Sequence, residues 1–389
     1  MILFNEAENI VLKDKHNLGT EKVHFHNSIG RILAEDVFSD VNFPPFDKSA
    51  MDGFALKQSD IDKELVIIET IAAGQAPKKR IKEGQTAKIM TGAPVPKGSN
   101  FVIQVELSEL IGNNKVKFTG RSNNNIIPKA SELKKGEQVL KAGDRIDARH
   151  VAVLASVGKT EVLVYKQPIV GIISTGDEIV EPENQPKEAQ IRNSNGHQLI
   201  GQILQCGAIP LYYGIIKDNY ESTKQAITNA IKDCHILIIT GGVSMGDFDY
   251  VPKILIDLGV KIEFDKIAVK PGKPTTYGSI GNKYIFGLPG NPVSSFIQFD
   301  LLAKPLIFQL MNHKFKAKTS NLELAENYSR KKTDRLAHLP VQIINNKVYL
   351  SKYKGSAHIH ALSGSDGLIE IEKGRSELKK GAFIHVRLF

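Results

Sequence analysis

Three short stretches of this sequence combine glycine with hydroxyl, amide or carboxylate side chains directly after an apolar run. They read Ser174-Thr175-Gly176-Asp177-Glu178, Thr240-Gly241-Gly242-Val243-Ser244 and Pro289-Gly290-Asn291-Pro292. Glycine lets the backbone approach a ligand closely and turns N–H groups toward an anion. In the third stretch Asn291 can cap a helix that has Pro292 at its first position, and the free N–H groups of such a helix start favour a phosphate. Each stretch alone is as readily a simple tight turn, but the three together favour an anion-binding site.

Lysines and carboxylates accompany these loops. Lys266, Lys270 and Lys273 occur in a segment that two prolines stiffen, and lysines placed in this way can hold phosphates or an oxyanion. Asp218 ends an apolar run, and Asp249 follows the second glycine stretch. Carboxylates beside lysines suggest Mg²⁺, which takes a few carboxylates together with phosphate oxygens and water. Surface ion pairs are the alternative for any single charge, but they explain the clustering poorly.

From about residue 167 to 310, short apolar runs alternate with amphipathic stretches of helix length, and these elements must position the residues above. Strands are expected at Ile169 to Ile173, Ile209 to Ile216 and Ile236 to Ile239. Between them lie a helix capped by Asn195, with Gly207 beyond its end, and a second helix that carries Ile227, Ala230 and Ile231; a third, with Val251, Ile254, Leu255 and Leu258, stops at Gly259. This alternation predicts a doubly wound α/β domain with a parallel sheet, in which ligands bind beyond the carboxyl ends of the strands.

The flanking regions have the texture of β structure. Residues from about 41 to 140 predict short strands with turns at Gly53, Gly84 and 112–114. The tail from about residue 315 predicts a hairpin from Val341 to Leu350 around Asn345-Asn346, and further strands at Leu368 to Ile371 and Phe383 to Leu388.

Composition is that of an ordinary globular protein, with 41% hydrophobic and 24% charged residues among 389. The net charge of +9 comes mainly from scattered lysines, with short runs such as Arg330-Lys331-Lys332 interpreted as solvated surface. A small polyanionic substrate explains this charge, and a nucleic-acid partner is not expected. Two cysteines give no disulfide framework. Neither a secretion signal nor an apolar run of about 20 residues occurs, so we expect a cytoplasmic protein with no membrane association.

Six motifs in order make a family resemblance specific. PPFDKSAMDGFAL spans Pro44 to Leu56, IMTGAPVPKGSN spans Ile89 to Asn100, and ISTGDE, TGGVSMGDFDY, KPGKP and GLPGNPVSS follow. Together they resemble the molybdopterin molybdenumtransferase family, called MoeA in bacteria, to which the gephyrin E domain is similar. The resemblance covers nearly the whole chain.

The resemblance implies an elongated homodimer whose subunits have four domains. Residues 1–43 and 138–166 would form a linking domain I, 44–137 a β domain II, 167–312 the α/β pterin-binding domain III, and 313–389 a C-terminal domain IV like a small β-barrel. The implied reaction transfers molybdate to the dithiolene of adenylated molybdopterin and releases AMP, assisted by Mg²⁺. Implied protein partners are the molybdopterin adenylyltransferase upstream and molybdoenzymes or their chaperones downstream.

The resemblance also assigns site residues. Asp52 and Thr91 would reach the site from the partner subunit's β domain, and the other catalytic positions would be Glu178, Asp218, Asp249, Lys266 and Lys270. Asp218 and Asp249 would hold the metal. The substrate-binding positions would be Ser174, Thr175, Gly176, Gly241, Gly242, Ser244, Lys273, Pro289, Gly290, Asn291, Pro292 and Arg335.

The chain departs from the family pattern in two places. Ala130-Ser131-Glu132 stands where Gly-Glu-Asp is usual, and Leu339 and Pro340 stand where a second arginine is usual after Arg335. Two other functions compete with the insertase: a related enzyme that processes a pterin or nucleotide adenylate, and a non-catalytic scaffold like gephyrin. The first would keep the glycine loops but does not explain PPFDKSAMDGFAL, and the second would need a linker and a second TGG loop.

Overall fold

The computed structural model describes residues 1–13, 16, 18–243 and 250–389. The chain forms two compact units. Unit 1 comprises Met1–Ala34, Gly143–Asp147 and Val162–Phe389, and unit 2 comprises Glu35–Ala142 and Ala148–Glu161. Each unit has its own hydrophobic core.

A six-stranded sheet in the order β16-β13-β17-β21-β20-β18 forms the centre of unit 1. Its strands are β13 (Ile169–Thr175), β16 (Ile209–Ile216), β17 (Ile236–Thr240), β18 (Lys261–Phe264), β20 (Thr276–Ile280) and β21 (Lys283–Leu288). The first four strands of that order pair in parallel, as expected, but β20 runs antiparallel to both of its neighbours. The three strands expected from the sequence, β13, β16 and β17, are therefore parallel, and the antiparallel β20 is an addition that was not predicted from the sequence. β20 runs antiparallel to β21 because only residues 281–282 connect them, and a parallel pair needs a longer crossover.

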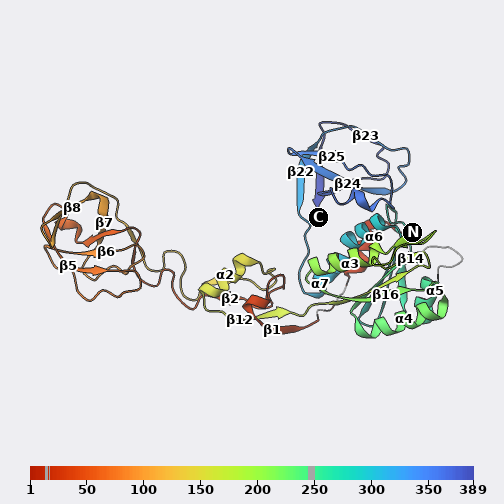
Figure 1. Ribbon diagram of the computed structural model, residues 1–389, viewed down its shortest axis with the longest axis horizontal. Helices are drawn as coiled ribbons and strands as arrows, with labels where there is room; N and C mark the ends of the chain where they lie inside the picture. Colours follow the sequence, from red (N-terminus) through yellow and green to blue (C-terminus); the bar gives the residue numbers. More distant parts are fainter. Residues whose placement is uncertain (14–15, 17, 244–249) are drawn as a thin grey trace. The chain divides into compact units, whose positions relative to one another are not determined.

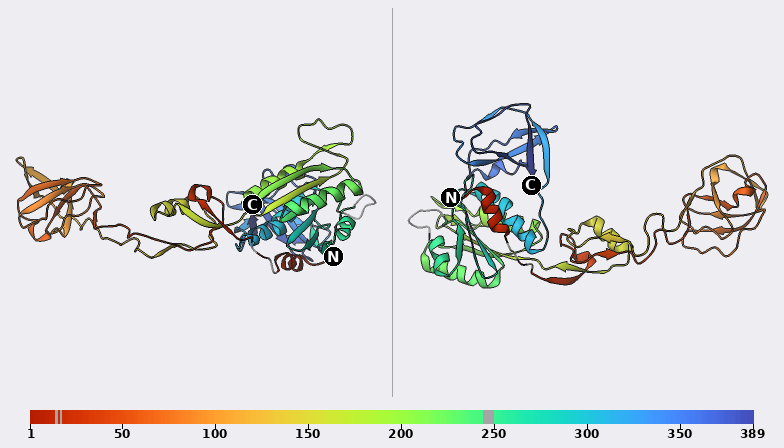
Figure 2. Two further views of the ribbon diagram at one scale, coloured as in Figure 1. Left: turned by 90° about the horizontal axis from the view of Figure 1, so that it is seen from below. Right: turned by 180° about the vertical axis from the view of Figure 1, so that it is seen from behind.

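Helices cover both faces of this sheet (Figures 1 and 2). Alternate residues of β17 pack into different cores, since Ile236 and Ile238 face one cluster of apolar side chains and Leu237 and Ile239 face the other. The first cluster includes α1 (Phe4–Leu12), α3 (Ser194–Gln205), α6 (Pro292–Gln298), the π-helical segment η4 (Phe299–Ala303) and α7 (Lys304–Leu310). The second includes α4 (Tyr220–Asp233) and α5 (Val251–Asp257). The predicted doubly wound α/β domain is confirmed.

The cap of α3 differs from the expected one. Asn193, not Asn195, precedes the helix, and its side chain accepts a hydrogen bond from the Gly196 N–H at 3.0 Å. Both asparagines suit a cap by residue type. The structure uses the earlier one because Asn195 lies inside the helix and bonds to neighbouring loops instead.

The C-terminal part of unit 1 is a closed barrel of five strands. They are β22 (Thr319–Leu324), β24 (Leu336–Ile344), β25 (Lys347–Leu350), β26 (Gly367–Ile371) and β28 (Phe383–Leu388). The order β24-β25-β22-β28-β26 closes because β26 also pairs with β24. Asn345 and Asn346 have φ values of 50° and 59°, which confirms the predicted hairpin turn.

Short pairings complete unit 1. β1 (Thr20–His24) pairs with β12 (Glu161–Tyr165), β14 (Ile179–Val180) with β15 (Ile191–Arg192), and β23 (Tyr328–Ser329) with β27 (Glu377–Leu378). Of more consequence for the site, β19 (Val269–Lys270) pairs in parallel with the first residues of β24, which joins the barrel to the α/β domain.

Unit 2 contains a six-stranded sheet in the order β7-β4-β6-β5-β9-β8. Its strands are β4 (Gly53–Leu56), β5 (Leu65–Ile71), β6 (Gln85–Ile89), β7 (Phe101–Gln104), β8 (Ser108–Ile111) and β9 (Lys115–Phe118). The smaller elements are β2 (Val37–Phe38), which pairs with β11 (Gln138–Leu140), β3 (Lys48–Ser49), which pairs with β10 (Ile126–Ile127), and α2 (Ala148–Ser156). The all-β texture expected for this region is present. In the described part of the chain, no helix is long and apolar enough to cross a membrane.

Gly53 begins a strand, so the turn expected there was wrong. A Cβ atom at Gly53 would lie 2.0 Å from the Ile103 carbonyl oxygen of β7, and this close approach is the reason for glycine. By contrast, Gly84 and Gly112 have φ values of 74° and 61° and lie outside the strands, as predicted.

We predict that Gly53→Val lowers the free energy of unfolding of unit 2 by more than about 2 kcal/mol, because backbone atoms must move to admit the side chain. Gly112→Asn is the matched control: nothing lies within 4 Å of its added Cβ, and asparagine tolerates positive φ. Hydrogen exchange of β4 and β7, followed by mass spectrometry, measures the difference. Equal protection of these strands in both variants would contradict the packing argument.

Candidate functional site

Three predicted loops follow neighbouring strands of the α/β sheet. Ser174 of β13 is paired with Thr240 of β17, and Thr240 is paired with Leu288 of β21. Because these strands are parallel and in register, the loops that follow them lie at one edge of the sheet. The stretches from Ser174, from Gly241 and from Pro289 are therefore brought together, and Ser174 and Thr175 are buried there.

Close backbone packing explains the glycines of this edge. Gly241 and Gly242 have φ values of 92° and 61°. A Cβ atom at Gly241 would lie 2.4 Å from the Thr175 carbonyl oxygen, and one at Gly242 would lie 2.9 Å from Thr175 Oγ1. Gly290 packs against the same loop, since its Cβ atom would lie 3.7 Å from Gly241 Cα. These glycines let the loops meet, and their contact with a substrate is still a prediction.

Asn195 joins two of the loops, a role that sequence reasoning missed. Its Nδ2 atom donates to Thr240 Oγ1 and to the Gly290 carbonyl oxygen, each at 2.8 Å. The side chain is almost fully buried, and its Oδ1 atom has no hydrogen-bond partner among the described residues. Its predicted role as a helix cap gave no signal of these contacts, because they come from residues far along the chain.

The start of α6 differs from the expected phosphate site. Asn291 is the N-cap residue and Pro292 the first helical residue, as predicted, but the Asn291 side chain makes no capping bond. The Val293 N–H donates to the Ser356 carbonyl oxygen at 3.0 Å. Part of the N–H set expected to be free is thus occupied by the segment that follows β25. The helix start serves the junction with the barrel, and the Asn291 side chain is left to line a cavity.

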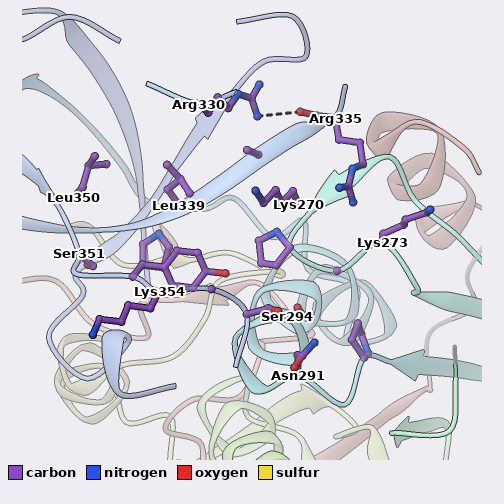
Figure 3. A pocket seen from close by; sticks show the side chains of 18 of the residues that line it. Lys270, Lys273, Asn291, Ser294, Arg330, Arg335, Leu339, Leu350, Ser351 and Lys354 are labelled. Carbon is purple, nitrogen blue, oxygen red and sulfur yellow. Dashed lines mark hydrogen bonds between the residues drawn. The ribbon is translucent and has the colours of Figure 1, made fainter. Parts of the chain in front are cut away.

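A cavity of about 640 Å³ lies between the α/β domain and the barrel. Its described lining includes Pro289, Asn291 and Ser294 from the sheet edge. Five cationic side chains also line it: Lys270, Lys273, Arg330, Arg335 and Lys354. Figure 3 shows Lys270, Lys273 and Arg335 together above Asn291 and Ser294, with Leu350, Ser351 and Lys354 on the other side. No Asp or Glu is among the described residues of the lining, so the cavity favours an anion.

Backbone carbonyl groups fix the two arginines. Arg335 Nη1 donates to the Val269 carbonyl oxygen at 3.3 Å, and its Nε atom lies 3.2 Å from Asp334 Oδ2. Arg330 donates to the carbonyl oxygens of Arg335, at 3.1 Å, and of Glu372, at 2.6 Å. Arg330 is therefore an exception to the interpretation of its basic run as solvated surface, whereas Lys331 and Lys332 are exposed as expected. Both guanidinium groups lie beside the cavity.

The three predicted lysines do not all reach the cavity. Lys270 lies on β19 and Lys273 follows shortly after, so both line it. Lys266 is not among the described lining residues, and its Nζ atom lies 3.6 Å from Asp265 Oδ2. The cavity thus contains two of these lysines and Arg335.

The predicted carboxylates lie beyond β13 and β16. The Asp218 N–H donates to Asp177 Oδ1 at 3.2 Å, so the ends of the two strands meet. A Cβ atom at Gly176, whose φ is 142°, would lie 2.7 Å from Glu178 Oε2, so the carboxylate lies against that glycine. The other two predictions of this group, Asp249 and Ser244, fall outside the described residues. Within the described ranges, no group of three or more metal-binding side chains occurs.

In unit 2 the structure brings Asp52 and Thr91 together. Asp52 Oδ1 accepts hydrogen bonds from both the N–H and the hydroxyl of Thr91, each at 2.7 Å. The backbone bond, followed by the hydroxyl bond, holds the pKa of the Asp52 carboxyl below its ordinary value, so it stays ionised near neutral pH. Glu132 of the departing Ala130-Ser131-Glu132 stretch lies in an exposed ion pair 3.6 Å from Lys48.

Three family descriptions match successive parts of the chain. The MoeA N-terminal region (domain I and II) matches residues 2–158, the probable molybdopterin binding domain matches 171–309, and the MoeA C-terminal region (domain IV) matches 322–389. The molybdopterin molybdenumtransferase of Bacillus subtilis is 36% identical over 300 residues, which are 74% of this chain and 70% of the relative. That of Staphylococcus epidermidis is 36% identical over 324 residues, 80% of this chain and 77% of the relative.

Solved structures agree with these matches. The molybdopterin biosynthesis MoeA protein from Pyrococcus horikosii is 31% identical with a TM-score of 0.83, covering 100% of this chain and 99% of that one. A structure of the molybdopterin biosynthesis MoeA protein from Pyrococcus horikoshii OT3 has a TM-score of 0.86 at 28% identity and covers both chains fully. With the sequence motifs, the fold and the relatives in accord, the chain belongs to the molybdopterin molybdenumtransferase family, whose members are transferases of molybdenum cofactor biosynthesis.

Proposed function

We propose that the protein transfers molybdate to the dithiolene of adenylated molybdopterin and releases AMP, with Mg²⁺ assisting. The observation that carries this proposal is the cavity beside Pro289 and Asn291, where five cationic side chains meet without a carboxylate in the described lining. A tetrahedral dianion suits this lining better than a neutral molecule does, because charge-assisted hydrogen bonds to lysine and arginine are strong.

In the proposed reaction, Lys270, Lys273 and Arg335 hold molybdate next to the loops that bind the pterin adenylate. Two Mo–S bonds form, and the two thiol protons leave with one molybdate oxygen as water, so molybdenum remains in oxidation state VI. Water then cleaves the phosphoanhydride between the pterin phosphate and AMP. The chain's part is to bind, orient and neutralise charge, which lowers the barrier without a covalent intermediate on the protein.

The described carboxylates could supply only some of the ligands of a Mg²⁺ ion. Mg²⁺ is commonly held by one or two carboxylates together with water and substrate phosphates, so a dense cluster is unnecessary. Asp218, beside Asp177, would supply one oxygen ligand, and Asp249 would supply the second. When bound, Mg²⁺ adds positive charge at the phosphate linkage.

We further propose that the protein works as a homodimer. Asp52 and Thr91 belong to unit 2, whereas the cavity belongs entirely to unit 1. The family resemblance implies that this pair reaches the site of the partner subunit. Two hydrogen bonds from Thr91 of the same chain fix the Asp52 carboxylate for that role. The activated pterin would come from an adenylyltransferase, and molybdoenzymes or their chaperones would receive the product.

Removal of a cavity lysine should weaken molybdate binding. We predict that Lys270→Ala and Lys273→Ala each raise the molybdate concentration for half-maximal AMP release by about tenfold or more, because each loses a charge-assisted hydrogen bond. Lys261→Ala, on an exposed edge strand, is the matched control. Lys266→Ala distinguishes the residues assigned from the cavity from those assigned by the family resemblance. Because Lys266 lies outside the described lining, its removal should leave this molybdate concentration unchanged. Half-maximal concentrations equal to the control's in both cavity variants would exclude the site.

The carboxylates should act in the insertion step more than in binding, because they repel a free polyanion. We predict that Asp218→Asn and Glu178→Gln still bind the adenylate but release AMP at least about tenfold more slowly. Extra Mg²⁺ should restore part of the rate of Asp218→Asn. The measurement is AMP release from pre-bound adenylate after molybdate addition, with and without chelator. Release at the parent rate in both variants, insensitive to chelator, would make these carboxylates structural.

Mixing two variants that are each impaired, assayed at limiting molybdate, tests the shared site. Lys270→Ala damages unit 1 and Asp52→Asn damages unit 2, so a mixed dimer has one site with neither change. Random exchange of subunits should recover about a quarter of the parent's AMP release, since half of the dimers are mixed and each restores one of two sites. Activity no higher than the mean of the separate variants, with mixed dimers present by mass spectrometry, would show that each chain builds its own site.

A further inference from the structure

A loop leaves the α/β sheet after β13, carries Asp177 and Glu178, and returns at the start of α3. Within it, β14 pairs with β15 in parallel, with Ile179 opposite Ile191. The Ile191 N–H donates to the Glu178 carbonyl oxygen, and the Asn193 N–H donates to that of Val180, each at 2.8 Å. We call residues 176–192, between β13 and α3, the excursion. The position of the Glu178 backbone therefore depends on how firmly this excursion is attached to the sheet.

A buried hydrogen-bond network attaches the excursion at its ends. Asn193 Nδ2 donates to Ser174 Oγ at 3.1 Å and to the Tyr212 hydroxyl at 2.7 Å, while Asn193 Oδ1 caps α3. Ser174 ends β13, and Tyr212 belongs to the neighbouring strand β16. Ser174 and Asn193 are almost completely buried, so a lost partner would leave a polar group unsatisfied. Gly196 completes the packing, because a Cβ atom there would lie 2.8 Å from Asn193 Nδ2.

Glu181 extends the network to the excursion itself. The Tyr212 hydroxyl donates to Glu181 Oε1 at 2.6 Å, and His197 Nε2 of α3 lies 3.0 Å from Glu181 Oε2. Burial, and then the Glu181 carboxylate, raise the pKa of Tyr212 well above its ordinary value, so the hydroxyl remains a donor. Glu181 directly follows β14, three residues after Glu178. Its two partners lie on β16 and α3, both of which pack in the same hydrophobic core.

We propose that Glu181 and Tyr212 form a clamp that positions the Glu178 loop for the insertion step. The clamp comprises Ser174, Glu181, Asn193, His197 and Tyr212. Neither Glu181 nor Tyr212 has to touch the substrate: Tyr212 fixes Glu181, Glu181 fixes β14, and β14 limits where the Glu178 carboxylate lies. The inference rests on the proposed function, in which Glu178 serves the insertion step. A small displacement of a fixed group lowers the rate of a step while leaving binding of the remote parts of the substrate intact.

Tyr212→Phe removes one hydroxyl and keeps the ring. Tyr213→Phe is the matched control, because Tyr213 is the next residue of β16 and its hydroxyl donates to Asp233 Oδ2 at 3.1 Å, away from the clamp. We expect Tyr212→Phe and Glu181→Ala to slow AMP release from pre-bound adenylate by about 10- to 100-fold, with the dissociation constant of the adenylate changed less than about twofold. Glu181→Gln should keep most of the rate, because glutamine still accepts from Tyr212. A role of Glu181 in proton transfer would instead make the Gln and Ala variants equally slow.

Hydrogen exchange of residues 176–192 in the free protein tests the clamp without turnover. Exchange should be about tenfold faster in Tyr212→Phe and Glu181→Ala than in Tyr213→Phe. If Tyr212→Phe turns over and exchanges like Tyr213→Phe, the clamp is overturned. If the parent protein releases no AMP, the proposed function fails, and the exchange rates alone decide whether the clamp exists. Should Tyr212→Phe fail to fold, the half-exposed Glu181 supplies the variants Glu181→Ala and Glu181→Gln for both measurements.

Discussion

A two-residue strand pairing holds the C-terminal barrel against the α/β domain, and the cation-lined cavity depends on it. Val269 and Lys270 of β19 pair with Leu336 and Ala337 of β24. The same pairing brings Lys270 of β19 near Arg335, which directly precedes β24 and donates to the Val269 carbonyl oxygen. Other contacts support the junction, notably the bond from the Val293 N–H to the Ser356 carbonyl oxygen and the ion pair of Arg387 with Asp300, 2.8 Å apart. The α/β domain and the barrel thus each supply one wall of the cavity.

The junction gathers like charges, which repel one another unless an anion is present. Backbone carbonyl groups hold Arg330 and Arg335. The one carboxylate described beside them, Asp334 at Arg335 Nε, is not part of the described cavity lining. Lys270 and Lys273 are exposed enough for water and salt to screen their repulsion while the cavity is empty. A bound dianion removes that repulsion, so it should stabilise the folded protein as well as occupy the site. The structure accordingly suits an oxyanion substrate better than a resident structural ion.

The sequence predicted those parts of the fold that follow from local patterns. Alternating apolar runs placed β16 with its correct ends, and Asn345-Asn346 predicted the hairpin turn. The glycine loops were correctly expected at one sheet edge because parallel strands determine where their ends lie. The cap at Asn193 was missed because Asn195, two residues later, has the same side chain and fits a cap equally well. The strand at Gly53 was missed because glycine is also typical of turns, and only the close approach of Ile103 shows why it occurs in a strand.

Residues of the cavity show where sequence reasoning ends. Arg330 belongs to a basic run whose sequence looks like that of a solvated surface segment. Only its hydrogen bonds to the carbonyl oxygens of Arg335 and Glu372 show that it is fixed beside the cavity. Asn195 links two loops through bonds that span 45 and 95 residues of the chain. Lys266 and Lys270 occur in one motif, yet only Lys270 reaches the cavity because it belongs to the strand that pairs with the barrel. Motifs identify the segments of the site, while tertiary pairing selects which side chains meet.

The most direct test of the oxyanion cavity is anomalous X-ray scattering at the molybdenum absorption edge from crystals equilibrated with molybdate. The account predicts an anomalous peak in the cavity, within hydrogen-bonding distance of Lys270, Lys273 and Arg335, that disappears in Lys270→Ala crystals treated in the same way. Molybdate bound at another position of the parent protein, with this cavity empty, would contradict the account.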